Sequence, residues 1–452
     1  MKSVAAVQEA LAKIQEIDQS GYTLNSVLAV APDALEKAEA YDRKNSDLPL
    51  QGLPILIKDN IEVLGLPASA GSLALADTPI AQDSTIARRL REAGAVIIGA
   101  TNLSEWANIR STKSTSGWSA LGGLTANPWK HSRSAGGSSS GSGASVAAGL
   151  TQWAIGSETD GSIICPASLN GCVGIKPTVV SIPRDGMVPI SASQDSPGPM
   201  AQTVEQAAIL LDVLTGKSEF AKAVASDQKI KIGVVRKWMT SNNELNLLFE
   251  DSVKVLEKHG FTLVDVELSE PAEQDHEDEL RVLLYELSEG LGTYLSGRSG
   301  ARFSSLREVV AFNIEHSSSE LQHFGQELFE MALDFESQRD EYLASRARNK
   351  LWAEKTLSDG LTDVDILIGC TFGPAWESNL ETGDNFQEAS WICTAPSIAG
   401  TPIGTIPMGL VSGLPVGLGF VSARNQEAKL IGAMAKAEHA LDLGILKPSF
   451  SK

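Results

Sequence analysis

Residues 136–141 read GGSSSG and residues 158–163 read ETDGSI, and both follow an apolar run, LPILIK, at residues 53–58. Together these stretches supply two serines that follow glycine, Ser138 and Ser162, and one lysine, Lys58, but no histidine. Serine hydrolases normally use histidine to accept the proton of the nucleophile, so a serine enzyme built from these stretches needs another base. The pattern favours a nucleophile, a relay and a lysine base.

Ser162 lies in a turn of small residues, after Asp160 and Gly161 and before two isoleucines. Such a turn can expose the hydroxyl and direct successive backbone N–H groups to one point, which is the arrangement of an oxyanion hole. The alternative interpretation of this segment alone is a serine in an ordinary turn.

Ser138 lies 24 residues before Ser162, in a serine run that follows two glycines. Residues 137–141 (GSSSG) also fit the pattern of the α/β-hydrolase nucleophile elbow. That motif needs a buried strand before the serine, and residues 129–133 (WKHSR) do not form one. The sequence therefore gives no support to the α/β-hydrolase fold, and a plain loop is the alternative.

Lys58 closes the apolar run, which predicts a buried strand over residues 53–57. A lysine at the end of such a strand either extends its amine to the surface or serves as a functional amine. To act as a base it must be neutral, and burial favours the neutral amine.

Other motifs fail at a required position. Leu211 occupies the place of the first glycine of a phosphate loop, Ser422 that of the third glycine of a dinucleotide site, and Leu280 that of the second histidine of a zincin helix. The six histidines form no ligand-like cluster and are expected at the surface. We therefore expect neither cofactor nor metal.

The charge balance bears on the partners of this 452-residue chain. Acidic residues outnumber basic ones by 56 to 37, and the net charge of −19 repels nucleic acids and anionic lipids, so we expect neither as a partner. The first residues meet charges too early for a secretory signal, which favours a cytoplasmic location. The four cysteines form no C-x-x-C pair and are expected to be reduced and mostly buried.

Alternating strand and helix patterns predict an α/β fold. The predicted helices lie around residues 4–17, 34–41, 84–93, 204–214, 245–258 and 426–441, and the predicted strands around 53–57, 95–99, 230–235, 262–268, 364–368, 404–407 and 416–421. Residues 101–175 are rich in Gly, Ser, Thr and Ala, but large apolar residues interrupt them, which argues against a flexible linker. Residues 270–355 are acidic and helical by pattern, and are expected to add a helical layer.

The order and spacing of these stretches resemble the amidase signature family. The matching segments are GLPILIKDN at 52–60, GAVIIGATNLSE at 94–105, NPW at 127–129, GGSSSGSG at 136–143, residues 156–178, and GLPVGL at 413–418. The resemblance implies a single large α/β domain over residues 1–452, with a mixed central β-sheet sandwiched between α-helices. The signature-bearing core is then expected at about 45–215 and 360–440, with a helical insertion at about 270–355.

Carried over by position, the resemblance implies that Ser162 is the nucleophile that forms the acyl-enzyme, Ser138 the bridging serine and Lys58 the base. It also implies a cis peptide bond between Gly137 and Ser138, with Gly137 and Ser139 in supporting roles. The backbone N–H groups expected to bind the oxyanion are those of Thr159, Asp160, Gly161 and Ser162.

One departure narrows the choice of substrate. Many family members, including the glutaminase subunits of tRNA amidotransferases, carry two glycines before the nucleophile and an arginine two residues after it, whereas this chain has Asp160-Gly161 and Ile164. ETDGSI followed by Cys165-Pro166 resembles the peptide amidase branch, whose members remove the C-terminal carboxamide of peptides. We expect a peptide amide or small amide as substrate, no cofactor, and a monomer or homodimer. The alternatives are a glutaminase-type subunit of an amidotransferase, an aryl acylamidase and a catalytically silent scaffold.

Overall fold

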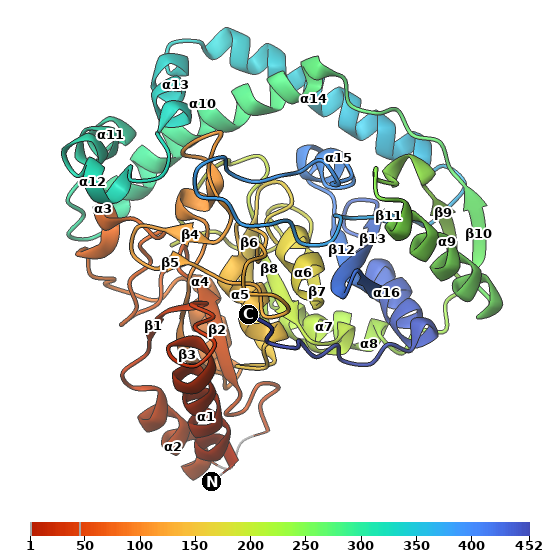
Figure 1. Cartoon of the computed structure of the whole chain (residues 1–452), viewed down its shortest axis with the longest axis horizontal. Coiled ribbons are helices and arrows are strands. Elements are labelled where there is room, and N and C mark those ends of the chain that lie inside the picture. Colours follow the sequence, from red (N-terminus) through yellow and green to blue (C-terminus); the bar gives the residue numbers. More distant parts are fainter. Residues whose placement is uncertain (1, 45–46) are drawn as a thin grey trace.

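One mixed β-sheet forms the centre of the computed structural model, which describes residues 2–44 and 47–452 (Figure 1). Within these residues, eleven strands pair in the order β1-β3-β2-β6-β8-β7-β12-β13-β11-β9-β10. The strands are β1 (Val27–Val30), β2 (Pro54–Lys58), β3 (Val96–Thr101), β6 (Trp153–Glu158), β7 (Val173–Lys176), β8 (Ser196–Ala201), β9 (Lys231–Val234), β10 (Thr262–Asp265), β11 (Ile366–Cys370), β12 (Ile403–Val411) and β13 (Leu414–Ser422). A separate hairpin joins β4 (Trp118–Ser119) and β5 (Gly123–Leu124).

Strand direction brings the ends of β2 and β6 together. β2 is parallel to β3 and to β6, β9 is parallel to β10 and β11, and the remaining neighbours are antiparallel. Parallel neighbours end at the same edge of a sheet, so Lys58, the last residue of β2, lies near the end of β6, from which the chain continues to Ser162. The mixed sheet also confirms the predicted fold class.

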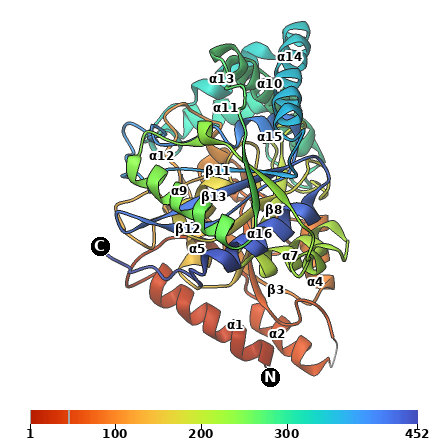
Figure 2. The same cartoon turned by 90° about the vertical axis from the view of Figure 1, so that its right-hand side faces the viewer.

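Helices cover both faces of the sheet (Figures 1 and 2). They are α1 (Lys2–Lys13), α2 (Ala34–Arg43), α3 (Leu73–Ala76), α4 (Thr85–Glu92), α5 (Ser140–Ala147), α6 (Ile164–Asn170), α7 (Val204–Thr215), α8 (Phe220–Ala223), α9 (Asn243–Lys258), α15 (Thr394–Ala399) and α16 (Glu427–Leu441). There are also a short π-helix, η1 (Ile14–Asp18), and two short 3₁₀-helices, η2 (Glu105–Asn108) and η3 (Arg236–Trp238). α5 packs against α6, and α7 contacts α4, α8 and α16. The central sheet is therefore sandwiched between helices, as the resemblance implied.

Local sequence explains where several helices begin and end. The side chains of Ser84, Thr203 and Asn242 each accept a hydrogen bond from a backbone N–H in the first turn of the helix that follows. Gly171 and Gly216 end α6 and α7 in the left-handed conformation that glycine adopts most readily. The boundaries thus follow the residue types that favour helix ends.

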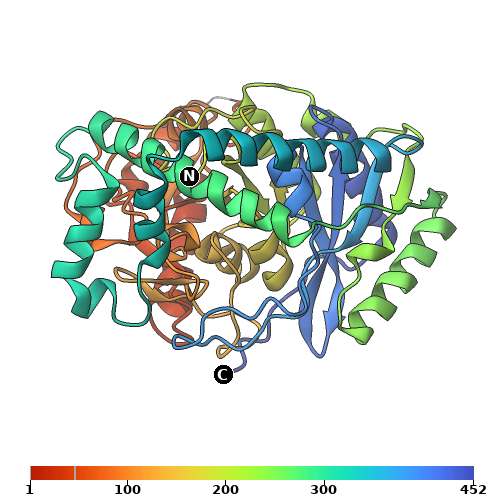
Figure 3. The same cartoon turned by 90° about the horizontal axis from the view of Figure 1, so that it is seen from above.

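Five further helices, α10 (Glu273–Gly297), α11 (Leu306–Glu315), α12 (Ser317–Glu320), α13 (Glu327–Phe335) and α14 (Arg339–Gly360), form a layer beyond one edge of the sheet. α10 and α14 arch over the top in Figure 1, and Figure 3 shows them running along the length of the molecule. Apolar residues such as Leu287 and Phe329 pack this layer against Trp106 and Ile190 of the main body. Among the described residues, no helix is long and apolar enough to cross a membrane.

The predicted helices and strands match elements of the structure closely, and residues 270–355 are largely helical, as the pattern predicted. The elements that the pattern did not predict include β1, β6, β7 and β8, and also α5 and α6. Residues 101–175 contain α5, β6, α6 and most of β7, and much of this segment is buried. Their small side chains carry little hydrophobic periodicity, so the elements are stabilised by tertiary packing rather than signalled by local pattern.

Candidate active site

Lys58 ends β2, an interior strand of the sheet, and its side chain is fully buried. Its Nζ lies 2.7 Å from Ser138 Oγ, 3.0 Å from Ser157 Oγ and 3.2 Å from the Ser157 carbonyl oxygen. The alternative interpretation, an amine extended to the surface, is therefore wrong. The loop of Ser138 and the α5 helix that follows it pack against β2, which keeps the amine from reaching solvent.

Ser138 lies in the loop before α5, and the Gly137–Ser138 peptide bond is cis, as the resemblance implied. A side chain at Gly137 would overlap the Ser104 hydroxyl, so glycine is required here. Ser139 continues the loop: its hydroxyl donates to the Ser157 carbonyl at 3.0 Å and its N–H donates to the Ser162 carbonyl at 3.1 Å. These bonds link the loop of Ser138 to both β6 and the turn of Ser162.

Ser162 follows the end of β6, in a turn where Gly161 has a φ of +76°. The Glu158 carboxylate accepts hydrogen bonds from the N–H groups of Ile163 at 2.7 Å and Ile164 at 2.9 Å, at the start of α6. The Gly161 N–H also lies against this carboxylate, so this expected oxyanion donor has a competing partner. Thr159 is held from the other side, because its hydroxyl donates to Asp195 at 2.6 Å.

Burial sets the protonation of the lysine. The pKa of Lys58 is lowered from 10.5 to about 7 by burial, against the attraction of the Asp195 and Glu158 carboxyls, which raise it. Near neutral pH a large fraction of Lys58 is therefore a neutral amine, able to accept a proton from the hydroxyl 2.7 Å away.

Ser162 lines a cleft of about 320 Å³ that opens beside α10 and the segment between β11 and α15. Besides residues of the turn, the lining includes Ile109, Ile190, Leu283, Phe372 and Phe386. Of the described residues that line the cleft, Asp160 alone carries a carboxyl group, and none is Lys, Arg or His. The walls are thus mostly apolar, and the one strongly ionisable group is acidic.

Two of the four cysteines, Cys165 and Cys393, also line this cleft. All four are buried and none forms a disulfide, in agreement with the prediction of reduced, buried cysteines. Burial raises the pKa of the Cys165 and Cys393 thiols, which keeps them in the unreactive protonated form.

Sequence patterns did not identify three polar residues near Lys58 and Ser162. Ser157 contacts Lys58 and receives a hydrogen bond from Asn60 Nδ2 at 2.9 Å, and Glu279 reaches Asp160 from α10. Ser157 and Asn60 lie in the matching segments, but only the pairing of β2 with β6 brings them together. Glu279 lies more than 100 residues away in the helical layer, where no local pattern marks it.

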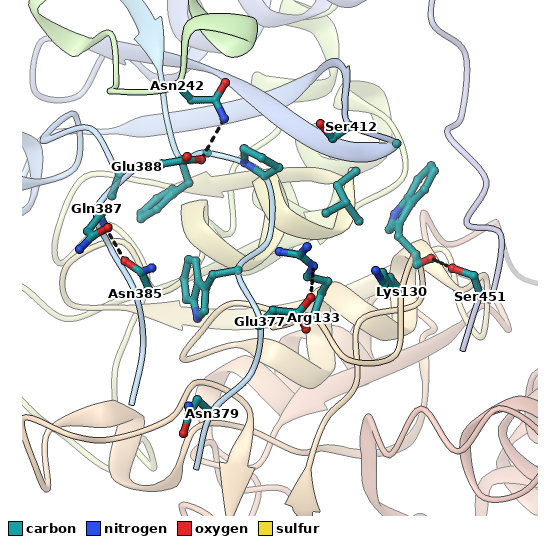
Figure 4. A pocket seen from close by; sticks show the side chains of 18 of the residues that line it. Lys130, Arg133, Asn242, Glu377, Asn379, Asn385, Gln387, Glu388, Ser412 and Ser451 are labelled. Atoms are coloured by element: carbon teal, nitrogen blue, oxygen red, sulfur yellow. Dashed lines mark hydrogen bonds and ion pairs between the residues drawn. The ribbon is translucent and has the colours of Figure 1, made fainter. Parts of the chain in front are cut away.

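A larger cavity of about 790 Å³ is lined in part by residues of the segment after β11 (Figure 4). Figure 4 shows the Arg133–Glu377 ion pair, 3.0 Å long, and the hydrogen bond from Asn242 Nδ2 to Glu388 on its walls. None of Lys58, Ser138 and Ser162 lines it, although it shares Phe372 with the smaller cleft. The larger volume therefore does not mark the candidate active site.

The sequence and the structure of this chain are similar to those of amidases. The family model described as Amidase matches residues 5–431. A probable amidase of Arabidopsis thaliana is 33% identical over 94% of this chain and 83% of its own length, and one subunit of the glutamyl-tRNA(Gln) amidotransferase of Methanosarcina mazei is 31% identical over 94% of this chain and 92% of its own. The crystal structure of the peptide amidase of Stenotrophomonas maltophilia has a TM-score of 0.91 and 39% identity, covering 100% of this chain and 96% of that one.

Proposed function

This chain belongs to the amidase signature family and is an amide-hydrolysing enzyme, and on that basis we propose that it removes the carboxamide of a peptide C-terminus or of a small neutral amide. The observation that carries the proposal is the buried Lys58 amine, 2.7 Å from Ser138 Oγ. Lys58 ends β2 beside the end of β6, and the turn of Ser162 follows β6. A serine nucleophile without a histidine partner needs such a base.

In the proposed reaction, Ser162 Oγ attacks the amide carbonyl carbon while its proton passes to Ser138 Oγ, whose own proton passes to neutral Lys58. Backbone N–H groups of residues 159–162 stabilise the negative oxygen. The C–N bond then breaks as the proton returns through Ser138 to the nitrogen, and ammonia or an amine leaves. Water attacks the acyl-enzyme by the same relay and releases the acid.

The peptide-amide substrate is supported by the similarity to the peptide amidase of S. maltophilia and by the cleft lining. Apolar and aromatic walls suit a hydrophobic acyl side chain, and ammonia is a small leaving group. A glutaminase role is the alternative, since the M. mazei amidotransferase chain is 31% identical to this one. Against it, glutamine carries an α-carboxylate, and among the described lining residues no cationic side chain is present to pair with it.

Substrate charge provides a test of this choice. We expect the purified chain to hydrolyse N-acetylphenylalanine amide without ATP, tRNA or a partner. Butanamide should exceed succinamate in kcat/KM by about 10²-fold, because the carboxylate of succinamate would be buried without a cation. Ammonia release measures both reactions. If glutamine and succinamate were hydrolysed faster than neutral amides, the proposal would be contradicted and the glutaminase alternative favoured. If anilides were the preferred substrates, an aryl acylamidase would be favoured.

The pH dependence should follow Lys58. Because burial lowers its pKa to about 7, the amine loses its proton there rather than near 10.5, and kcat/KM should rise as pH increases through about 7. The measurement is kcat/KM for a neutral peptide amide, which does not itself titrate, from pH 5.5 to 9. Activity that is highest at pH 5.5 and declines toward pH 8 would rule out a neutral lysine as the base.

A further inference from the structure

Two carboxyl groups meet beside the nucleophile. Asp160, two residues before Ser162, lines the cleft, and its side chain lies against that of Glu279 on α10. Gln194 Nε2 donates to Glu279 Oε1 at 2.8 Å, and the Ser397 hydroxyl donates to Asp160 Oδ1 at 3.3 Å. This carboxyl pair therefore joins the turn of the nucleophile to the helical layer.

The groups around the pair do not neutralise it by contact. Glu158 faces it from β6 and Cys393 from the segment before α15, and Lys176 faces it from β7. Lys176 Nζ, however, donates to the carbonyl oxygens of Thr401 at 2.7 Å and Pro396 at 3.4 Å, not to either carboxyl. Glu279 is buried and Asp160 is partly exposed in the cleft, and two carboxyls in contact at such a site cannot both be charged without strong repulsion, so they share a proton.

The titration of both groups agrees with this geometry. Burial raises the pKa of Asp160, as does the neighbouring Glu158 carboxyl, and burial raises the pKa of Glu279 well above its usual range, with Asp160 adding to the shift. The proton of the pair is therefore retained at a pH at which exposed carboxyls are fully ionised.

We propose that Glu279, held by Gln194, is a positioning residue, which keeps the Thr159–Ser162 turn in its active geometry through its contact with Asp160. The inference rests on the proposed function, in which the N–H groups of this turn bind the oxyanion. While the two carboxyls share one proton, the contact fixes the Asp160 side chain and with it the backbone of the turn. When that proton is lost, repulsion between the carboxylates separates the turn from α10, and the N–H groups lose their alignment.

Activity should therefore fall again at alkaline pH, above the rise caused by Lys58, as the carboxyl pair loses its proton. This fall is the alkaline limb of the pH profile. Glu279→Gln tests its origin. The oxygen of the new amide can keep the hydrogen bond from Gln194, which turns its N–H toward Asp160. The bond to the Asp160 carboxylate then needs no titrating proton.

We expect Glu279→Ala to lower kcat by about tenfold and to change KM much less. Glu279→Gln should restore most of the lost kcat. In Glu279→Gln the alkaline limb should move up by at least about one pH unit or disappear. Glu286→Gln is the matched control: Glu286 is also buried on α10, but it binds Ser191, Ser193 and Tyr342, and its variant should keep the wild-type limb. An alkaline limb that is the same in Glu279→Gln and wild type overturns the proposal.

A second measurement is independent of catalysis. A carboxyl with a raised pKa in the folded state stabilises the fold below its unfolded pKa, and this stabilisation is lost as pH rises through the folded pKa. In a Ser162→Ala background, the free energy of unfolding should therefore fall more steeply between about pH 5 and 8 when Glu279 is present than when the Glu279→Gln change is added. If the free energy of unfolding has the same pH dependence with and without Glu279→Gln, the inference is overturned even if the enzyme is active. If the two pH dependences differ but the wild-type enzyme hydrolyses no amide, the result contradicts the proposed function and leaves this inference standing.

Discussion

Replacing Ser162 by alanine should abolish turnover, with kcat for a peptide amide reduced by about 10⁴-fold or more. The change removes the atom that is proposed to form the acyl-enzyme, and the other hydroxyl of this turn, that of Thr159, is bound to Asp195. Ser162 is partly exposed in the cleft, so its loss leaves no buried polar group unpaired, and the melting temperature should stay within a few degrees of wild type. Ammonia release and thermal unfolding measure the two quantities.

Ser139→Ala is the control for this prediction. Ser139 is fully buried and bonds both the N–H and the carbonyl of Ser157, but it does not line the cleft. Its loss should reduce kcat by about tenfold or less, through a small displacement of β6 against the Ser138 loop. If Ser139→Ala proved as damaging as Ser162→Ala, or if Ser162→Ala kept normal turnover, the assignment of the nucleophile would be wrong.

Replacing Lys58 by methionine should reduce kcat/KM by about 10³- to 10⁴-fold, because the hydroxyl of Ser138 loses the base that accepts its proton. The rise in activity through about pH 7 should vanish with it, since the group that titrates there is gone. Methionine has a similar length and suits an apolar site. Burial lowers the lysine pKa, which means that the charged amine opposes folding near neutral pH, so the variant should be at least as stable as wild type at pH 7.

Lys176→Met is the control that distinguishes the loss of the base from the general effect of removing a buried lysine. Lys176 is also fully buried, but its amine bonds the backbone near α15 and touches none of the three candidate catalytic residues. Its pKa is lowered to about 8 by burial, against the attraction of Glu158. A much smaller loss of kcat/KM is expected for Lys176→Met than for Lys58→Met. Equal losses, or a Lys58→Met variant that keeps the pH rise, would remove Lys58 as the base.

Much of the fold was predictable because the outer elements carry strong local patterns. The run at residues 53–58 is continuous and apolar, so β2 was identified from sequence, and amphipathic spacing identified α1, α7, α9 and α16. The segment around α5 and α6 gave no such pattern. Its buried residues are mainly Gly, Ala and Ser, and they pack because neighbouring backbones approach closely, as the overlap of a side chain at Gly141 with Ser26 and Asn102 shows.

The sequence by itself determined the family, the sheet-and-helix class and the chemical types at Lys58, Ser138 and Ser162, because these depend on residue identity and spacing along the chain. Only the tertiary structure decided the state of the lysine, since its burial and its 2.7 Å contact with Ser138 arise from the packing of the loop before α5 against β2. The same is true of Glu279, which reaches Asp160 only because the helical layer folds back over the sheet. Protonation depends on solvent exclusion and on charges close in space, and neither is a property of local sequence.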